Sequence, residues 1–254
     1  GRGGKRVRGA SCDRDRPLER ECGAFRRYEP ASRMADGLVN VLHVGRCDAD
    51  GLFYYVMELA DDAAAPQAEG TDAPNTEAYV PLTLRWMLES RRRLPLSDCL
   101  TIAQSLAQAV ASLHRAGLTH RDIKPSNIIF VNGRAKLADI GLVGDLGESR
   151  SVVGTEGYIP PEGPGHPGAD LFALGMVLYE MVTGLPPGEY PRVPGEWMDA
   201  RRSDELEFVE VVLHATEPDA TRRYQSAGEM LADLALMESG KSVRRVHLLE
   251  RRWK

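Results

Sequence analysis

Four side chains that carry oxygen or ammonium groups lie close together in the sequence, in a pattern that suits phosphoryl transfer. The stretch H-R-D-I-K-P-S-N begins at residue 120 and holds a candidate base, Asp122, a positive charge, Lys124, and a neutral metal ligand, Asn127. Seventeen residues after Asp122 comes Asp139, in D-I-G, a second candidate metal ligand. Because phosphoryl transfer is catalysed mainly by positioning and by neutralising negative charge, these groups are expected to meet at one site.

The motifs around these residues are together far more specific than the triplet H-R-D alone. The pattern H-R-D-x-K-P-x-N is followed by D-x-G and then by G-T-E-G-Y-I-P-P-E, from Gly154 to Glu162. With this combination the chain resembles the protein kinase family, in particular the eukaryotic-like serine/threonine kinases of bacteria, over roughly residues 5 to 240. The resemblance implies an ATP-dependent enzyme that phosphorylates Ser or Thr hydroxyls of proteins, with Mg²⁺, or Mn²⁺ in its place.

The resemblance implies a catalytic role for each motif residue. Asp122 would accept or orient the proton of the substrate hydroxyl, and Lys124 would reach the transferred phosphate as a compact charge. A lysine at this place is typical of the serine/threonine members. Asn127 and Asp139 would be the metal ligands, since Mg²⁺ is held by few protein oxygens together with phosphate and water. Thr155 matches the threonine that contacts the catalytic Asp and Lys in serine/threonine kinases.

Other matches imply structural roles. Asp170, in D-L-F-A-L-G, matches a helix aspartate that holds the backbone of the catalytic loop. Glu162 should pair with an arginine late in the chain, and of the candidates Arg222 and Arg223 the second fits the family spacing better. One departure is Ile140, which stands where the family has phenylalanine. It keeps an apolar side chain but loses aromatic volume, so we expect altered packing rather than loss of metal binding.

The adenine end of an ATP site is also expected from the resemblance. Residues 55–60 look like the last strand of the small lobe running into the hinge between the lobes. Met57 would be the gatekeeper residue. The carbonyl of Glu58 and the amide of Ala60 would hydrogen-bond adenine. Ile129 would form part of the floor beneath it.

The phosphate end of this site is less complete. Family members pair a lysine on the third strand with a glutamate on the following helix, and Lys5 and Glu21 are sixteen residues apart, which suits that pairing. The residues before Lys5 are Gly-Arg-Gly-Gly, which do not read as an apolar strand, and the chain contains no G-x-G-x-x-G loop. Either the chain lacks the first two strands and the phosphate-covering loop of the family, or the protein works without them.

Strand patterns precede helix patterns along the chain. Residues 38–58 read as a β-hairpin with a turn at its centre. Apolar spacing and end signals predict four helices. The first runs from Leu96, with Ser97 as a candidate N-cap, to Gly117, and the second covers 170–183 and is closed by Gly184. The third covers 205–215, and the fourth runs from the capping box at 226–229 through Met237.

This order implies an α+β fold rather than alternating βαβ units. It fits the two-lobed kinase fold. We therefore expect a small β-rich lobe, truncated, at residues 1–59, a large helical lobe at 60–240, and a basic tail or linker at 241–254.

Composition adds limits on partners and location. With 254 residues, 43% hydrophobic and 27% charged, the chain has an ordinary globular composition, and its net charge of -5 argues against non-specific nucleic-acid binding. The four cysteines show no metal-ligand spacing, so free thiols in a reducing cytosol are expected. No apolar run approaches the roughly 18 to 20 residues that a membrane helix needs. We predict a cytoplasmic domain, alone or as part of a larger membrane-anchored protein.

Two other classes of function remain as alternatives. A catalytically silent, kinase-like nucleotide-binding or scaffold module would account for the missing glycine-rich loop, but it has no chemical need for the residues of the H-R-D and D-I-G motifs. A small-molecule phosphotransferase of related fold shares the Asp and Asn of the catalytic loop. Such enzymes generally lack a lysine like Lys124 and a segment like 154–162, which binds extended peptide.

Overall fold

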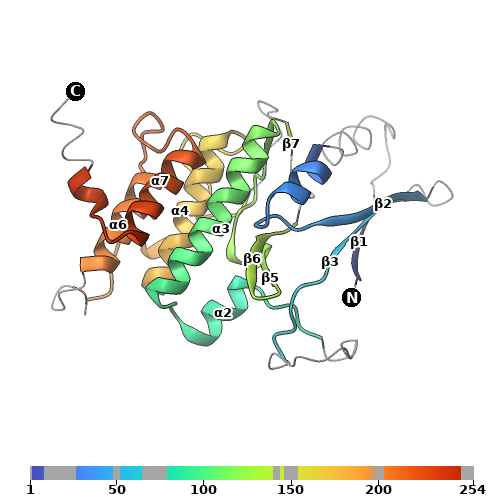
Figure 1. Cartoon of the computed structure of the whole chain (residues 1–254), viewed down its shortest axis with the longest axis horizontal. Coiled ribbons are helices and arrows are strands. Elements are labelled where there is room, and N and C mark those ends of the chain that lie inside the picture. Colours follow the sequence, from blue (N-terminus) through green and yellow to red (C-terminus); the bar gives the residue numbers. More distant parts are fainter. Residues whose placement is uncertain are drawn as a thin grey trace.

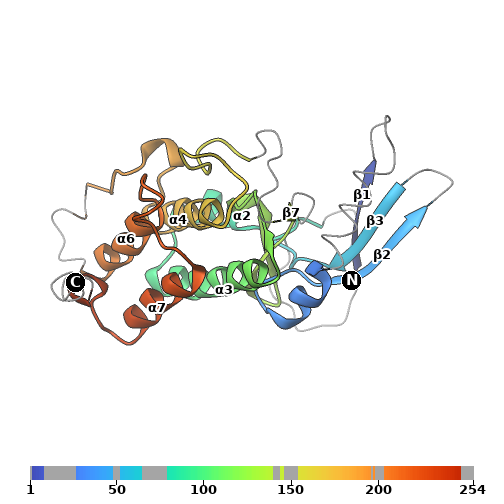
Figure 2. The same cartoon turned by 90° about the horizontal axis from the view of Figure 1, so that it is seen from above.

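The structure is a computed structural model that describes residues 2–8, 27–47, 52–64, 79–139, 144–145, 154–195, 197 and 203–246. A small β-sheet lies at one end of the molecule, and the helices of the second half of the chain gather at the other end (Figure 1). Seen from above, the sheet stands apart from the helical part and is joined to it through a narrow region (Figure 2). The predicted α+β fold with two lobes is therefore confirmed.

The small lobe is built on an antiparallel sheet in the order β1-β3-β2, formed by β1 (Arg2–Arg8), β2 (Val41–Cys47) and β3 (Leu52–Glu58). The pairing of β2 with β3 confirms the hairpin predicted over residues 38–58. Residues 27–34 form a helix beside this sheet, and their Tyr28 hydroxyl donates to the Val39 carbonyl at 2.9 Å. Most of the stretch before this helix lies outside the described residues.

The first strand of the hairpin begins at Val41, later than the apolar run starting at Leu38 suggested. The preceding residues pair instead with β6 (Arg134–Leu137) of the large lobe, where Leu38 forms a parallel bridge to Leu137. The Val39 amide donates to the Leu137 carbonyl at 3.0 Å. The apolar run is thus divided between the two lobes, and residues 37–40 attach one lobe to the other.

Short elements frame the loop that carries the H-R-D motif. They are β4 (Leu118–Thr119), a 3-10 helix (Pro125–Asn127), β5 (Ile128–Val131), β6 and β7 (Gly144–Asp145). β4 pairs with β7, and β5 pairs with β6. The loop is therefore fixed at both ends by strands, and its last residues form one turn of helix.

Helix α3 (Leu96–Arg115) confirms the first predicted helix and buries its apolar face against the core. Gly117 follows its end with a φ of +73°, as expected for a residue that leaves a helix. The prediction of Ser97 as N-cap is wrong. The N-cap lies two residues earlier, at Pro95, which makes no side-chain bond, and the Ser97 hydroxyl donates to Asp98. A proline has the fixed φ that suits a helix start.

Helix α4 (Pro167–Thr183) lies at the centre of the large lobe and is buried over most of its circumference. His166 caps it, accepting from the Ala169 amide at 3.2 Å, and Gly184 ends it with a φ of +71°. A Cβ at Gly184 would lie 2.9 Å from the Arg92 carbonyl oxygen, so the turn also requires a small residue.

No helix in the described part of the chain, including the apolar α4, has the length and apolar character to cross a membrane.

The remaining large-lobe helices are α2 (Leu84–Arg91), α6 (Ser203–Ala215) and α7 (Ala227–Glu238). The capping box predicted for α7 is confirmed in its first half, because Ser226 accepts from the Glu229 amide at 3.3 Å. The Glu229 carboxylate accepts from the Gln225 amide, one residue before the cap, at 2.8 Å. Beyond α7, the described part of the predicted tail packs on α6. There the Ser242 hydroxyl donates to Glu207 at 2.6 Å.

Candidate active site

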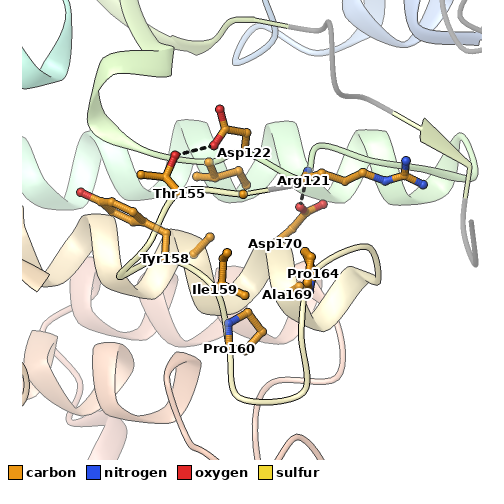
Figure 3. Close-up of a pocket in the computed structure, with 12 residues that line it drawn as sticks. Arg121, Asp122, Thr155, Tyr158, Ile159, Pro160, Pro164, Ala169 and Asp170 are labelled. Atoms are coloured by element: carbon orange, nitrogen blue, oxygen red, sulfur yellow. Dashed lines mark hydrogen bonds between the residues drawn. The ribbon is translucent and has the colours of Figure 1, made fainter. Parts of the chain in front are cut away.

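The side chains predicted to be catalytic meet in one hydrogen-bonded group, of which Figure 3 shows the bond between Thr155 and Asp122. Lys124 Nζ lies 2.7 Å from Asp122 Oδ2 and donates to Thr155 Oγ1 at 2.9 Å. The Thr155 hydroxyl in turn donates to Asp122 Oδ1 at 2.8 Å. Asn127 Nδ2 donates to Asp122 Oδ2 at 2.8 Å and to the Asp122 carbonyl at 2.9 Å. Asp122 is thus the common partner of the other three.

The surroundings of Asp122 keep its carboxylate ionised. Burial by itself would raise the pKa of Asp122, but the hydrogen bonds from Lys124 and Thr155 and the charge of Lys124 outweigh burial and hold the pKa below its usual value. An ionised carboxylate beside an ammonium group can orient a hydroxyl and accept its proton.

A buried aspartate on α4 holds the backbone of this loop from below. Asp170 Oδ2 accepts from the His120 amide at 2.9 Å and Oδ1 accepts from the Arg121 amide at 2.9 Å, while His114 Nε2 lies 2.9 Å from Oδ2. Arg121 has a φ of +71°, a strained value for a residue with a side chain, and the two amide bonds hold it there. Burial favours the neutral acid, yet the bond from His114 and the nearby charges outweigh it and lower the pKa of Asp170. The expectation for Asp170 agrees with this geometry.

His120 links the loop to the D-I-G motif. Its side chain is fully buried, and burial lowers its pKa despite the nearby carboxylates, so the ring is neutral at pH 7. Nε2 therefore carries the proton and donates to the Ala138 carbonyl at 3.0 Å. Ala138 precedes Asp139, which has a φ of +58°. The two motifs are thus joined through the core and not only along the chain.

A cavity of about 340 Å³ between the lobes brings together the residues expected to hold adenine and metal. Its lining includes Met57, Glu58, Ala60 and Ile129 from the hinge and floor, and Asn127 and Asp139 from the catalytic loop and the D-I-G motif. Asn127 therefore faces this cavity and contacts Asp122 at the same time. The volume falls within the range of small-molecule sites.

The donor set that Asn127 and Asp139 bring to this cavity fits a hard divalent cation. Asn127 uses its amide nitrogen for Asp122, so its side-chain oxygen is left for a metal, and Asp139 offers a carboxylate. Nowhere in the described ranges do three or more His, Cys, Asp or Glu side chains form a metal-binding group. One amide and one carboxylate suit a cation that takes its other ligands from phosphate and water.

Of Lys5 and Glu21, the pair expected at the phosphate end of the site, only Lys5 lies among the described residues. Residues 2–8 form β1 although no apolar pattern predicted a strand, and the Lys5 backbone pairs with Tyr55 of β3, two residues before Met57. Pairing with β3 supplies backbone hydrogen bonds whatever the side chains are, which explains why the apolar pattern was a poor guide. Glu21 and Ile140 lie outside the described residues.

The predicted ion pair at the end of the substrate segment is confirmed. Arg223 Nη1 donates to Glu162 Oε1 at 2.6 Å and Nη2 donates to Oε2 at 3.3 Å, a bidentate pair. The same guanidinium donates to the carbonyls of Glu217 and Gly168. Burial alone would raise the pKa of Glu162, but the bonds from Arg223 outweigh it and lower the pKa. Arg222, the other candidate, lies 4.0 Å from Glu217 instead.

Sequence analysis did not predict a second buried ionic group beneath the substrate segment. Glu180 of α4 is only 4% exposed, and its carboxylate accepts from Arg85 Nη1 of α2 at 3.1 Å and from the Tyr158 hydroxyl. Arg85 Nη2 also donates to the Tyr158 oxygen at 3.1 Å. A buried acidic residue in an apolar helix indicates a cationic partner. The sequence gives no indication of which cation, because Arg85 lies 95 residues away.

Comparison with known proteins agrees with this site. The sequence profile described as Protein kinase domain matches residues 75–235. A probable serine/threonine-protein kinase of Corynebacterium efficiens is 33% identical over 229 residues, covering 79% of this chain and 32% of its own length. Serine/threonine-protein kinase PknB of Mycobacterium leprae is 30% identical over 229 residues, covering 80% of this chain and 34% of its own.

The profile covers more than half of the chain, and both relatives are bacterial serine/threonine kinases by name. The chain spans about a third of the length of these curated relatives. The expectation of an ATP-dependent serine/threonine kinase domain, drawn from the motifs, is confirmed at the level of the family. This chain belongs to the protein kinase family, among the bacterial serine/threonine kinases.

Proposed function

We propose that this domain transfers the γ-phosphoryl group of ATP to Ser or Thr hydroxyls of proteins, with Asp122 as the group that orients the hydroxyl and accepts its proton. The observation that supports this most strongly is the bonded group of Asp122, Lys124, Thr155 and Asn127 beside the interlobe cavity. Positioning and charge neutralisation are what phosphoryl transfer needs most.

Each residue has a distinct task in this proposal. The acceptor oxygen attacks the γ-phosphorus, the bond to the β,γ-bridging oxygen breaks, and the hydroxyl proton passes to Asp122. Lys124 neutralises charge on the transferred group, and Thr155 holds Lys124 and Asp122 in position by bonding both. Asn127 and Asp139 would hold Mg²⁺, or Mn²⁺ in its place. That cation would neutralise the charge of the ATP phosphates.

The adenine would occupy the inner part of the cavity. The Glu58 carbonyl and the Ala60 amide would bond its edge, Met57 would limit the depth of the pocket, and Ile129 would lie beneath the ring. Lys5 and Glu21 would complete the phosphate end as an ion pair. The cavity supports the first four roles. The position of Lys5 on β1, next to β3, is compatible with the last.

The substrates, partners and location of the whole protein are also proposals. We place the lobe boundary between residues 59 and 60, in the hinge, and the start of the tail after residue 240. A cytoplasmic location, alone or as the cytoplasmic part of a membrane-anchored protein, fits an enzyme that uses ATP. Nothing in the geometry favours a catalytically silent module, since the four catalytic side chains bond to one another as transfer requires.

Labelled phosphate tests the proposal and identifies the acceptor. The purified protein is incubated with [γ-³²P]ATP, Mg²⁺ and casein as a mixed acceptor, and the product is hydrolysed for phosphoamino-acid analysis. We expect labelled phosphoserine and phosphothreonine, and no label when a chelator removes the metal. Absence of transfer would favour the silent module, and label confined to phosphotyrosine would contradict the assignment of the acceptor.

A further inference from the structure

The side chain of Glu58, in the hinge, joins three segments of the molecule. Glu58 Oε1 accepts from Lys136 Nζ of β6 at 2.6 Å and from the Asn40 amide at 2.8 Å, and Oε2 accepts from Asn40 Nδ2 at 3.3 Å. The Glu58 amide donates to the Asn40 carbonyl at 3.1 Å, so the two residues also bond through their backbones. One carboxylate thus connects the hinge, β6 of the large lobe and the segment between the lobes.

The segment that carries Asn40 is itself rigidly attached to the large lobe. The Leu137 amide donates to the Gly37 carbonyl at 2.8 Å, next to the Val39 bond described above. Gly37 packs so closely on α3 that a Cβ there would lie 2.3 Å from the Ser105 carbonyl oxygen. Asn40 therefore offers Glu58 a fixed partner and not a mobile one.

The lysine of this group is buried in a place where a lysine is seldom found. Lys136 is 7% exposed and pairs in register with Ile129, the residue proposed as the adenine floor. A buried ammonium group needs an anionic partner, and Glu58 is that partner. The carboxylate is thus held by a charge-assisted bond to a residue outside the cavity lining, while Glu58 itself is part of that lining.

We infer that Glu58, held by Lys136 and Asn40, is a positioning residue for the nucleotide: its carboxylate fixes the hinge so that the Glu58 carbonyl and the Ala60 amide face adenine. This inference rests on the proposed adenine site. A structural contact would change stability alone, whereas a positioning contact sets the affinity for nucleotide. The effect belongs to nucleotide binding and not to the transfer step, because none of the three residues bonds to the Asp122 group.

The test compares Lys136→Met with Arg134→Met. Both replace a β6 cation by an apolar side chain, but Arg134 forms an exposed pair with Asp36. Binding of the non-hydrolysable analogue AMP-PNP is measured by calorimetry, and transfer to casein is measured as a function of ATP concentration.

For Lys136→Met we expect the Kd for AMP-PNP and the KM for ATP to rise about tenfold, the effect of losing one charge-assisted bond. Turnover at saturating ATP should stay within about twofold, and Lys136→Arg should recover part of the affinity. Arg134→Met should bind as the wild type does.

Two further variants keep the result decisive. If Lys136→Met does not fold, Glu58→Gln takes its place, because it keeps the shape and one acceptor oxygen but removes the charge and the second acceptor, and a Kd rise of several fold is expected. Ala60→Pro, which removes the hinge amide, tests the adenine site itself. Unchanged binding by folded Ala60→Pro would reject that site. Weakened binding by Ala60→Pro with unchanged binding by Lys136→Met, or by its substitute, would overturn the role of Glu58 alone.

Discussion

The catalytic loop and the hinge are held in different ways. The loop rests on Asp170, which is 2% exposed and bonds two consecutive backbone amides. The hinge rests on Glu58, whose side chain is 18% exposed and bonds one lysine and one asparagine. Buried polar contacts are costly to break because the remaining partners lose water without compensation. The difference indicates that the loop proposed to perform chemistry is held firmly, whereas the wall proposed to bind nucleotide is held more weakly.

Removing the anchor of the loop should have the largest effect. Asp170→Ala leaves the His120 and Arg121 amides and His114 without their common acceptor in the core. We expect the free energy of unfolding to fall by about 3 to 5 kcal/mol and phosphotransfer to be lost. Urea unfolding and the casein assay measure both, with the exposed Asp36→Ala as control. A variant that kept wild-type transfer would show that the loop does not depend on this anchor.

The next effect concerns the end of the substrate segment. Arg223→Met breaks the pair with Glu162 and leaves two carbonyls without donors. Because Glu162 is partly exposed, we expect a loss of about 2 kcal/mol rather than the value for a fully buried pair. Arg222→Met, at the neighbouring exposed position, should change the free energy of unfolding by less than about 0.5 kcal/mol. Equal losses in the two variants would contradict the asymmetry between these arginines.

A smaller effect is expected beneath the substrate segment. Tyr158→Phe removes the hydroxyl that bonds Glu180 and Arg85 but keeps the ring in place. The loss should be about 1 kcal/mol, the usual net value of such a bond, with a higher KM for casein and an unchanged KM for ATP. Steady-state kinetics with each substrate varied in turn distinguishes the two. A change in the KM for ATP alone would contradict this prediction, because it would mean that Tyr158 affects nucleotide binding and not the substrate segment.

The smallest effect is on pH dependence. The folded-state pKa of Asp122 lies below its ordinary value, so its contribution to stability is complete above about pH 4 and is lost as pH falls through the folded-state pKa. The difference in free energy of unfolding between the wild type and Asp122→Asn should therefore be equal at pH 7 and pH 5 and smaller at pH 3. Urea titrations at these three values measure it. A difference that stays the same or grows between pH 5 and pH 3 would show that the pKa is not lowered.

Sequence analysis succeeded where the chemistry is local and failed where it is distant. Asp122, Lys124 and Asn127 lie within six residues, so their spacing alone identified the group, and family motifs placed Thr155 and Asp170. The helix ends at Gly117 and Gly184 followed from single residues. Glu58 and Lys136 are 78 residues apart, and no periodic pattern connects them.

Two errors have the same origin. The hairpin predicted over residues 38–58 includes Leu38, but tertiary pairing of Leu38 with Leu137 separates it from β2, which begins at Val41. The residues before Lys5 do not read as an apolar strand, although the resemblance implies a strand lysine there, since partner hydrogen bonds and not side-chain pattern determine β1. In both cases a partner from elsewhere in the chain decided the local structure.

The central claim is that the Asp122 carboxylate, fixed among Lys124, Thr155 and Asn127, serves the transfer of phosphate. Its most direct test is the initial rate of ³²P transfer to casein at saturating ATP, for the wild type and Asp122→Asn, with binding of AMP-PNP measured on the same samples. Loss of a general base predicts a rate lower by about 10²- to 10⁴-fold with nucleotide affinity within about twofold. Equal rates in the two proteins would contradict the claim.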